Sequence, residues 1–454
     1  MTMQRSGRTT GTRRQLLSAA GALSGGIVLA ACAGGGQGGS GGVKPGDAAP
    51  AALLKKGSTI QWAVDAGPTR TPLREDQIKL FKAKFPDLNV EALQGAANDE
   101  KLQALFAAGT PPDLFRTETA GMAFFASRNQ TAALDPMIRR DKYDLTDFFP
   151  TAWELWTWKE KHYGAPFLGI RIGYFNRALA QQVGAKIPTT WKDPAWTFEA
   201  FMDAAQKATV RTGTTASRWG VDIGGARRDW QPWVWNNGGE LFSADGTKVL
   251  LDQPAAMEAL QLLTDIVHKQ KVAPSPQELM AAGGRRPLFE AGNLLMYHEP
   301  VNNVAANRRG ASFDWSLMGL PRGKAKTPAA SGGGVGWFMP AESKVKDETW
   351  ELMKVLTSKE SVRLEAIRGE APPSRKSIAN EPEFISPAEA PKGDMKVVVE
   401  ALEFMHVETP LINGVEIDRI LTEELNPVWR GEKPLREAVN AAVAKIKPVL
   451  NPVS

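Results

Sequence analysis

The chain has 454 residues, 43% hydrophobic and 23% charged, which excludes a disordered or fibrous protein and allows two or three folded units. Its formal net charge is +5, but four arginines precede Cys32, so the remainder is nearly neutral and lacks a dense basic run for nucleic acid. The single cysteine excludes an intramolecular disulfide, and the four histidines show no metal-ligand spacing. We therefore expect no metal, no cofactor and no nucleic-acid partner.

Residues 1–31 are typical of a bacterial export signal. A basic start ends at Arg13 and Arg14, which resembles the twin-arginine signal, and an apolar stretch too short to span a bilayer follows. The ending Leu-Ala-Ala-Cys resembles a lipobox, with Cys32 as the lipidated residue. A lone cysteine in an apolar stretch can also be a small core residue, but the Gly/Ser-rich run after it favours a tether over residues 32–56.

The body of the chain alternates strand-like and helix-like segments. Residues 59–64 form a short β-prone run, after which Ile78, Phe81 and Phe85 recur at helical spacing until Pro86 ends the helix. The alternation continues with a strand at 89–93, a helix at 100–108 and a short strand at 113–115. This order indicates an α/β fold with a mostly parallel sheet.

Three longer helices are predicted farther along the chain. The first covers residues 196–209 and has Thr197 in position to cap it. The second covers residues 254–269, with Asp252 as the expected cap. The third covers residues 346–367 in one continuous helical region. No short-period repeat interrupts this pattern, which disfavours a solenoid.

Four separated segments carry a resemblance to one protein family. They are GYFNR at 173–177 with GAKIPTTW at 184–191; FEAGNLLM at 289–296; GLP at 319–321 with GGGVGW at 332–337 and WELMKVLTS at 350–358; and GEAPPSR at 369–375. In their order and spacing they resemble the extracellular solute-binding proteins typified by the sugar-binding components of bacterial ABC importers. Leu295 departs from the pattern, because the family usually has alanine there.

The resemblance implies a periplasmic-binding-protein-like fold: two discontinuous α/β lobes joined by a hinge of several crossings, with the ligand cleft between them. We expect crossings near Ile170, Glu299 and Pro340. The implied lobes are residues 57–169 with 299–339 and residues 170–298 with 340–454. The chain would then be a monomeric binding protein and not an enzyme. It would be held outside the cell by a lipid in the cell membrane and would deliver a solute to the permease subunits of an ABC importer.

The tryptophan content favours a di- or oligosaccharide, because sugars present apolar faces that stack on aromatic rings. The segment DWQPWVWNNGG at 229–239 offers Trp230, Trp235 and Asn236 as ligand contacts, although helix-core tryptophans would give the same pattern. The glycine run before Trp337 allows close backbone approach at Gly334 and makes Trp337 the leading stacking candidate. The same glycines could instead serve only as a turn into a hinge strand.

Charged residues at predicted strand ends and crossings are further candidates. Asp65 and Glu118 follow strand-like runs, but each could equally be a solvated loop carboxylate or a helix cap. Arg171 and Glu299 lie beside predicted crossings. Each could contact the ligand or could form a salt bridge between the lobes that sets the closure equilibrium. Arg375 matches the position from which the family's C-terminal loop reaches ligand, with a surface arginine as the alternative. The adjacent arginines at 227 and 228 would suit a phosphorylated or acidic solute.

Two other classes of function remain open from the residues alone. A secreted, lipid-anchored glycoside hydrolase would also use a tryptophan-lined cleft, but it needs a pair of carboxylates that no segment marks. The sequence also lacks a nucleophile elbow, a zinc-protease motif and a phosphate loop. A lipid-anchored adhesion or scaffold protein would need neither hinge crossings nor a deep cleft.

Overall fold

The computed structural model describes residues 54–96, 99–213, 215–389, 391 and 394–450, which all belong to one structural unit. The predicted export signal and Cys32 lie outside these residues. Among the helices in the described ranges, none is both long enough and apolar enough to cross a bilayer.

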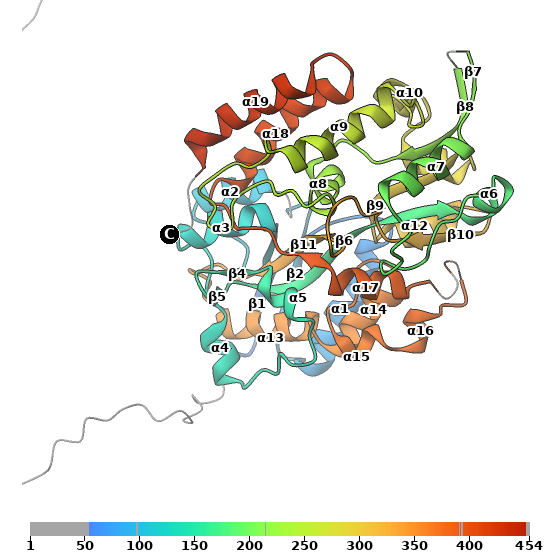
Figure 1. The fold of residues 1–454 in the computed structure, drawn as a ribbon. Helices are drawn as coiled ribbons and strands as arrows, with labels where there is room; N and C mark the ends of the chain where they lie inside the picture. The colour runs from blue at the N-terminus through green and yellow to red at the C-terminus, as the bar shows by residue number, and fades with distance from the viewer. Residues whose placement is uncertain (1–53, 97–98, 214, 390, 392–393, 451–454) are drawn as a thin grey trace, which may run out of the picture. The chain divides into compact units, whose positions relative to one another are not determined.

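The strands form one mixed sheet and two small two-stranded sheets (Figure 1). Their bounds are β1 Thr59–Val64, β2 Asn89–Gln94, β3 Phe115–Glu118, β4 Thr157–Trp158, β5 Lys161–His162, β6 Gly164–Asn176, β7 Val210–Thr212, β8 Thr215–Asp222, β9 Leu294–Pro300, β10 Trp315–Met318, β11 Ala330–Phe338 and β12 Met405–His406. The large sheet has the order β12-β11-β6-β9-β8-β7, with β10 also paired to β6 and β3 to β11. Strands β1 and β2 pair in parallel, and Trp62 of β1 makes a parallel bridge to Leu114 just before β3.

The expectation of a mostly parallel sheet was wrong. The long strand β6 pairs antiparallel with β9, β10 and β11, because each of these later segments returns in the opposite direction. Strand β6 also changes its neighbours along its length. Residues up to Ile170 pair with β11, and residues from Arg171 onward pair with β9, so the switch falls at the predicted crossing.

The helices pack on this framework in two groups. Their bounds are α1 Arg70–Lys84, α2 Asp99–Ala107, α3 Thr119–Ser127, α4 Asp135–Arg140, α5 Pro150–Glu154, α6 Arg177–Gln182, α7 Phe198–Ala208, α8 Arg227–Asn236, α9 Pro254–His268, α10 Pro276–Ala281, α11 Arg285–Glu290, α12 Asn303–Gly310, α13 Lys346–Leu356, α14 Lys359–Ile367, α15 Lys376–Ala379, α16 Pro382–Ile385, α17 Lys396–Glu403, α18 Gly414–Trp429 and α19 Leu435–Ile446, followed by the 3-10 turn η1 Lys447–Val449. We define the first group as β1–β3, α1, α3, α13 and α14, and the second group as α7–α9, β8, β9, α18 and α19, from their mutual contacts; α3 also contacts α18, so the two groups touch there. In Figure 1 the helices α13 and α14 lie on the opposite side of β6 and β11 from α9, α18 and α19.

Local sequence signals account for several element boundaries. The Thr197 hydroxyl accepts a hydrogen bond from the Ala200 N–H at 3.3 Å and caps α7 as predicted. Helix α9 instead has Gln253 at its N-cap, so the expected cap at Asp252 was wrong by one residue. The predicted helical region at 346–367 is two helices, because the first ends at Leu356 with Thr357 as its C-cap and Ser358 caps the second through the Ser361 N–H.

Residues 346–367 pack against the first group of elements. Helices α13 and α14 both contact α1, while the lobe boundaries stay a prediction. The buried Gln77 amide of α1 donates to Glu365 of α14 at 2.7 Å and to Ser361 at 2.8 Å. A buried polar group requires such partners, so this contact holds the two helices in register.

Candidate functional site

A pocket of about 390 Å³ lies where the two groups meet over the middle of β6. The first group contributes the start of α1, strand β3 and the loop after α14. The second group contributes the start of α8 and Asp418 and Thr422 of α18, while the paired strands β6 and β11 supply residues 167–171 and part of 331–335. The pocket therefore has walls from both groups and lies at the crossing of the sheet.

Glycines let β6 and β11 approach closely under the pocket. A Cβ on Gly334 would lie 2.1 Å from the Gly169 nitrogen, and Gly334 has a positive φ of 89° that L side chains rarely adopt. A Cβ on Gly333 would lie 3.2 Å from Nη1 of Arg228. The glycine run thus serves strand contact and the seating of an arginine, and Gly334 itself lines the pocket.

The chemistry of the pocket wall is dominated by guanidinium groups. The described residues that line it include five arginines, three carboxylates and a single aromatic ring, that of Phe167. The charged residues are Arg70, Arg116, Arg171, Arg227 and Arg228, with Glu118, Glu370 and Asp418. No tryptophan is among the described residues that line it. Each guanidinium carries five N–H donors in a fixed plane, so the pocket is rich in donors for oxygen acceptors.

Four of these arginines are held by carboxylates. Arg70 Nε lies 2.9 Å from Glu370, and Arg228 Nη2 lies 3.1 Å from Glu118. Arg227 pairs with Glu408 at 2.9 Å and with Asp418 at 2.7 Å. Burial lowers the pKa of Arg227, but these two carboxylates outweigh it and leave the pKa raised. Such pairs fix the direction of each guanidinium before any ligand binds.

Arg171 belongs to a buried ionic network behind the pocket. Its Nη1 pairs with Asp229 of α8 and lies 3.6 Å from Glu299 of β9. Arg285 lies on the far side, 3.6 Å from Asp229 and 3.1 Å from Glu299. Burial raises the pKa of both carboxyl groups, although the two arginines oppose the shift. The network ties β6, β9, α8 and α11 together at the crossing.

A neutral histidine adjoins this network. His298 of β9 is fully buried, and burial together with the charges of Arg171 and Arg285 lowers its pKa to about 3. Its imidazole is therefore uncharged at physiological pH. Among the described residues, no group of three or more His, Cys, Asp or Glu side chains is arranged to hold a metal ion.

Trp337 lies in the core of the first group rather than in the pocket. It is fully buried and packs edge-on against Trp62 with ring centroids 5.2 Å apart. The Arg74 guanidinium lies 4.8 Å from the Trp337 ring and 4.6 Å from the Phe167 ring, within cation–π range. The Trp337 ring therefore contacts a buried arginine, and that arginine in turn holds Asp65 at 3.3 Å.

Asp65 supports the pocket from behind without lining it. It pairs with Arg74 and, at 3.5 Å, with Arg70, whose side chain reaches the pocket. Burial acts to raise the pKa of Asp65, but the charges of Arg74, Arg70 and Arg116 outweigh it and lower the pKa. Asp65 is therefore ionised and positions Arg70.

The predicted aromatic segment at 229–239 forms the buried helix α8. Trp230 and Trp235 are at most 5% exposed, and Trp235 stacks on His406 with centroids 4.2 Å apart. The Asn236 side chain is satisfied by backbone groups: it donates to Pro232 and Ala329 and accepts from the Ala329 N–H at 3.1 Å. The structure thus agrees with the helix-core interpretation of this segment.

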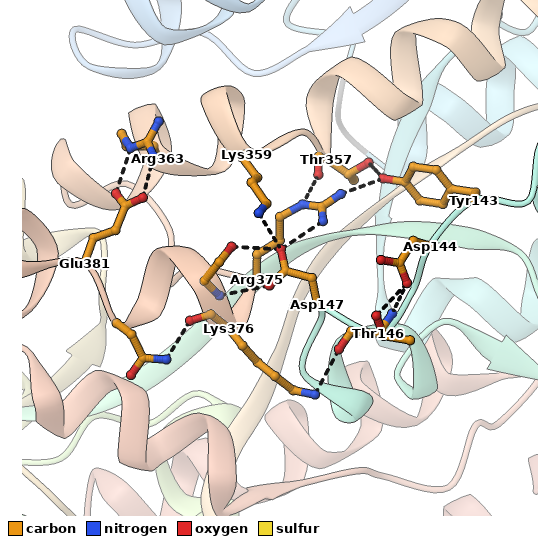
Figure 2. A network of polar contacts seen from close by, with 12 residues as sticks. Tyr143, Asp144, Thr146, Asp147, Thr357, Lys359, Arg363, Arg375, Lys376 and Glu381 are labelled. Carbon is orange, nitrogen blue, oxygen red and sulfur yellow. Dashed lines mark hydrogen bonds and ion pairs between the residues drawn. The ribbon is translucent and has the colours of Figure 1, made fainter.

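Arg375 lies in a separate polar network (Figure 2). Its Nε donates to the Thr357 carbonyl at 2.7 Å, Nη1 to Asp147 at 3.1 Å and Nη2 to the Tyr143 hydroxyl at 3.1 Å. The guanidinium also lies 4.0 Å from the ring centre of Phe148. With these contacts it joins the start of α15 to α13 and to the loop before α5, and it does not line the pocket.

The structure brings three of the sequence-predicted residues into the pocket wall: Glu118, Arg171 and Gly334. Asp65 and Glu299 do not line the pocket but contact arginines that do. The remaining candidates lie elsewhere: Trp230, Trp235, Asn236, Trp337 and Arg375. Sequence reasoning missed Arg70 and Arg116. A signal existed for each, because Arg70 opens the helix after β1 and Arg116 lies in a strand that ends at the cleft. The pair Arg227 and Arg228 was noticed for its charge alone.

Comparisons with known proteins agree on one family. Residues 54–363 match the model of the bacterial extracellular solute-binding proteins. The probable ABC transporter-binding protein of Deinococcus radiodurans is 23% identical over 212 residues, 46% of this chain and 50% of that protein. The chain therefore spans about half the length of this curated relative.

Solved structures share the fold. The ABC substrate-binding protein of Listeria monocytogenes in complex with cycloalternan has a TM-score of 0.75 at 22% identity and covers 86% of this chain and 98% of its own. The GacH receptor of Streptomyces glaucescens, solved unliganded and with acarbose, has a TM-score of 0.74 at 19% identity, with 87% and 99% covered. UgpB of Mycobacterium tuberculosis in complex with glycerophosphocholine has a TM-score of 0.73 at 20% identity, with 86% and 98% covered. These likenesses confirm the predicted periplasmic-binding-protein-like α/β fold.

Proposed function

The chain belongs to the bacterial extracellular solute-binding protein family, and from this premise we propose that it captures a carbohydrate in the arginine-lined pocket and delivers it to an ABC importer. The observation that carries the proposal is the pocket itself. It lies at the crossing strands, it takes walls from both groups of elements, and it presents donors and acceptors suited to hydroxyl groups. The expected ligand is a di- or oligosaccharide.

Capture proceeds through movement of the two groups about the crossing strands. Such hinges absorb closure in a few backbone torsions, and the ligand stabilises the closed form by contacting both walls at once. The ion pair between Glu118 of β3 and Arg228 of α8 already joins the walls across the pocket. A bound solute would add further contacts of this kind. Permease subunits that recognise only the closed form would then respond to loading.

A hydrolase is the competing proposal, and the pocket disfavours it. Glycoside hydrolysis needs one carboxylic acid to protonate the leaving group and a second carboxylate at a defined separation. Each of the three carboxylates in the pocket wall is instead engaged by an arginine: Glu118 by Arg228, Glu370 by Arg70 and Asp418 by Arg227. Relatives in the family are transport binding proteins, which supports binding without turnover.

We also propose that a lipid on Cys32 anchors the chain outside the cell membrane, as a monomer, after an export signal at residues 1–31 is removed. The sequence ending Leu-Ala-Ala-Cys supports this, as does the family's extracellular location. The test is expression of Cys32→Ala with labelled palmitate. We expect label in the membrane fraction for the natural chain and an unlabelled, soluble or unprocessed variant. Equal labelling of the variant would contradict the anchor.

The binding proposal is tested by calorimetry and thermal melting of the purified protein with mono-, di- and oligosaccharides. We expect one class to bind and to raise the melting temperature in proportion to the logarithm of its concentration. The same samples are analysed for hydrolysis products. Release of sugar would favour the hydrolase, and absence of binding across the whole panel would contradict carbohydrate capture.

A further inference from the structure

The pocket has more cationic than anionic groups in its wall, and one cation there has no counter-ion. Arg116 of β3 is half-buried and lines the pocket, yet within the described part of the chain its side chain forms no ion pair or hydrogen bond. Its Nε is buried without an acceptor. Arg116 interacts electrostatically with Asp65, but Asp65 is already paired with two other arginines. A buried guanidinium N–H without an acceptor is costly, so a ligand oxygen at this position would be stabilised.

Arg228 lines the same pocket from the opposite wall, and its ion pair with Glu118 is weak. Its partner Glu118 has a side chain that is 52% exposed, whereas the Arg228 side chain is 17% exposed. Exposed partners contribute little to an ion pair, because water screens and solvates them. The other contact of Arg228 Nη2 is the neutral hydroxyl of Thr119 at 3.1 Å. An anion in the pocket could therefore take the place of Glu118 on Arg228 at small cost.

The start of α8 adds fixed positive potential to this wall. Residues Ala226, Arg227 and Arg228 form the N-cap and first turn, and all three line the pocket. Ala226 has no side chain that can cap the helix, and its own N–H donates to the Asp229 carboxylate at 3.1 Å. Helix N-termini favour negative charge. This effect supports the arginines and does not make a site without them.

The pocket also lacks what a neutral sugar ordinarily uses. Sugars stack their C–H faces on aromatic rings. Among the described residues that line the pocket, the only ring is that of Phe167, which is 3% exposed and has the guanidinium of Arg70 at 5.0 Å. The tryptophans that would serve this purpose are in the core. Recognition must therefore come mainly from guanidinium donors, whose forked geometry matches carboxylate and phosphate oxygens.

We propose that the solute carries an oxyanion, either a phosphate ester or a carboxylate, on a polyhydroxyl body. The oxyanion binds between Arg116 and Arg228, beside the first turn of α8. This inference rests on the proposed function, since it names the chemical class of the captured solute. The polyhydroxyl body occupies the remainder of the wall, where Glu370 and Asp418 supply acceptors. Because Arg116 and Arg228 lie on different groups of elements, the anion draws the two walls together.

The test compares matched neutral and anionic solutes by calorimetry at low and high salt. The probes are glucose against glucose 6-phosphate and glucuronate, glycerol against glycerol 3-phosphate, glycerophosphocholine, maltose and maltotriose. We expect at least one anionic member to bind at least tenfold more tightly than its neutral partner, with affinity falling as salt rises. The phosphate and carboxylate pairs show which oxyanion the pocket takes.

Three variants locate the effect. Arg116→Met should weaken binding of the anionic solute at least tenfold, and Arg228→Met should do the same. Arg436→Met removes an exposed arginine of α19 that does not line the pocket, so it should leave binding unchanged. Arg116→Lys keeps the charge without the fork and should retain part of the affinity. Melting temperatures of the unliganded variants verify folding. Arg116→Met removes no ion pair or side-chain hydrogen bond, so we expect it to have the melting temperature of the natural chain.

The outcomes separate this inference from the proposed function. Tight binding of a neutral sugar, equal to or better than every anionic solute, would overturn the inference and leave carbohydrate capture standing. Unchanged affinity for an anionic solute in Arg116→Met and Arg228→Met would also overturn it. Failure of every probe to bind would count against both proposals.

Discussion

Trp337 gives the sharpest test of whether the structure locates the site correctly, because a stacking role and a core role predict opposite behaviour. Trp337→Ala removes a ring that is fully buried, lies 5.2 Å from Trp62 and 5.5 Å from Phe167, and faces the Arg74 guanidinium at 4.8 Å. Truncating a buried tryptophan to alanine costs about 3–5 kcal/mol, because transfer and cavity terms add. The lost cation–π contact places this variant in the upper half of that range.

The assay is guanidinium unfolding of the natural chain, Trp337→Ala and Trp337→Phe. We expect a loss of roughly 4 kcal/mol for alanine at an unchanged denaturant slope, which is a large part of the 5–15 kcal/mol typical of a folded domain. Trp337→Phe keeps an aromatic ring and should cost about 1–2 kcal/mol. Since the ring does not line the pocket, folded Trp337→Phe should bind solute within about threefold of the natural chain, a difference under 1 kcal/mol. A loss of affinity above tenfold in Trp337→Phe, with stability unchanged, would refute the core assignment.

Three further outcomes follow from the described contacts. Arg375→Met should lose about 3–5 kcal/mol of unfolding free energy, because it leaves Asp147 without its buried partner. Lys376→Ala, at the exposed neighbouring residue, should stay within about 0.5 kcal/mol of the natural chain. A reduced solute affinity of folded Arg375→Met would contradict the placement of Arg375 in Figure 2. Burial raises the pKa of Glu365 to about 7 from 4.5, against the opposing charges of Arg74 and Arg70, so the folded chain retains a proton that the unfolded chain loses. The contribution of Glu365 to the free energy of unfolding is therefore greatest below about pH 4.5 and falls until about pH 7. Glu365→Gln should flatten this pH dependence in a series of denaturant melts. The same pH dependence in the variant and the natural chain would show that Glu365 is ionised throughout. Thr197→Ala removes the cap of α7 and should cost about 1 kcal/mol by the same melts, with Thr197→Ser restoring it; equal stability of Thr197→Ala and Thr197→Ser would show that the cap contributes nothing.

Much of the fold was accessible from the sequence because short-range signals encode it. Strand β1 falls at the predicted residues, and Thr197 caps α7 as expected. Strand β6 changes its neighbours between Ile170 and Arg171, beside the residue where the family resemblance placed a crossing. The break at Ser358 was missed because helical periodicity continues across it. The mixed direction of the large sheet was missed for a different reason. Strand direction depends on which distant segments pair with β6, and no local pattern contains that pairing.

The site was less accessible, since a side chain's role depends on what surrounds it. The strand-end argument found Glu118 and Arg171 without knowledge of packing. The sequence alone could not show the packing of Trp337, because its partners, Trp62 and Arg74, come from a distant part of the chain and enclose the ring. Arg116 became notable only once the structure showed that it has no counter-ion while its neighbours do.

Hydrogen exchange measured by mass spectrometry, with and without a saturating solute identified by the calorimetric panel, tests the central claim most directly. The account predicts slower exchange at residues 167–171, 226–228 and 332–335, the segments that form the pocket where the two groups meet. It predicts unchanged exchange at residues 143–147 and 374–377, which surround Arg375 in Figure 2. Protection confined to residues 143–147 and 374–377, or protection absent from the three pocket segments while solute is bound, would contradict capture in this pocket.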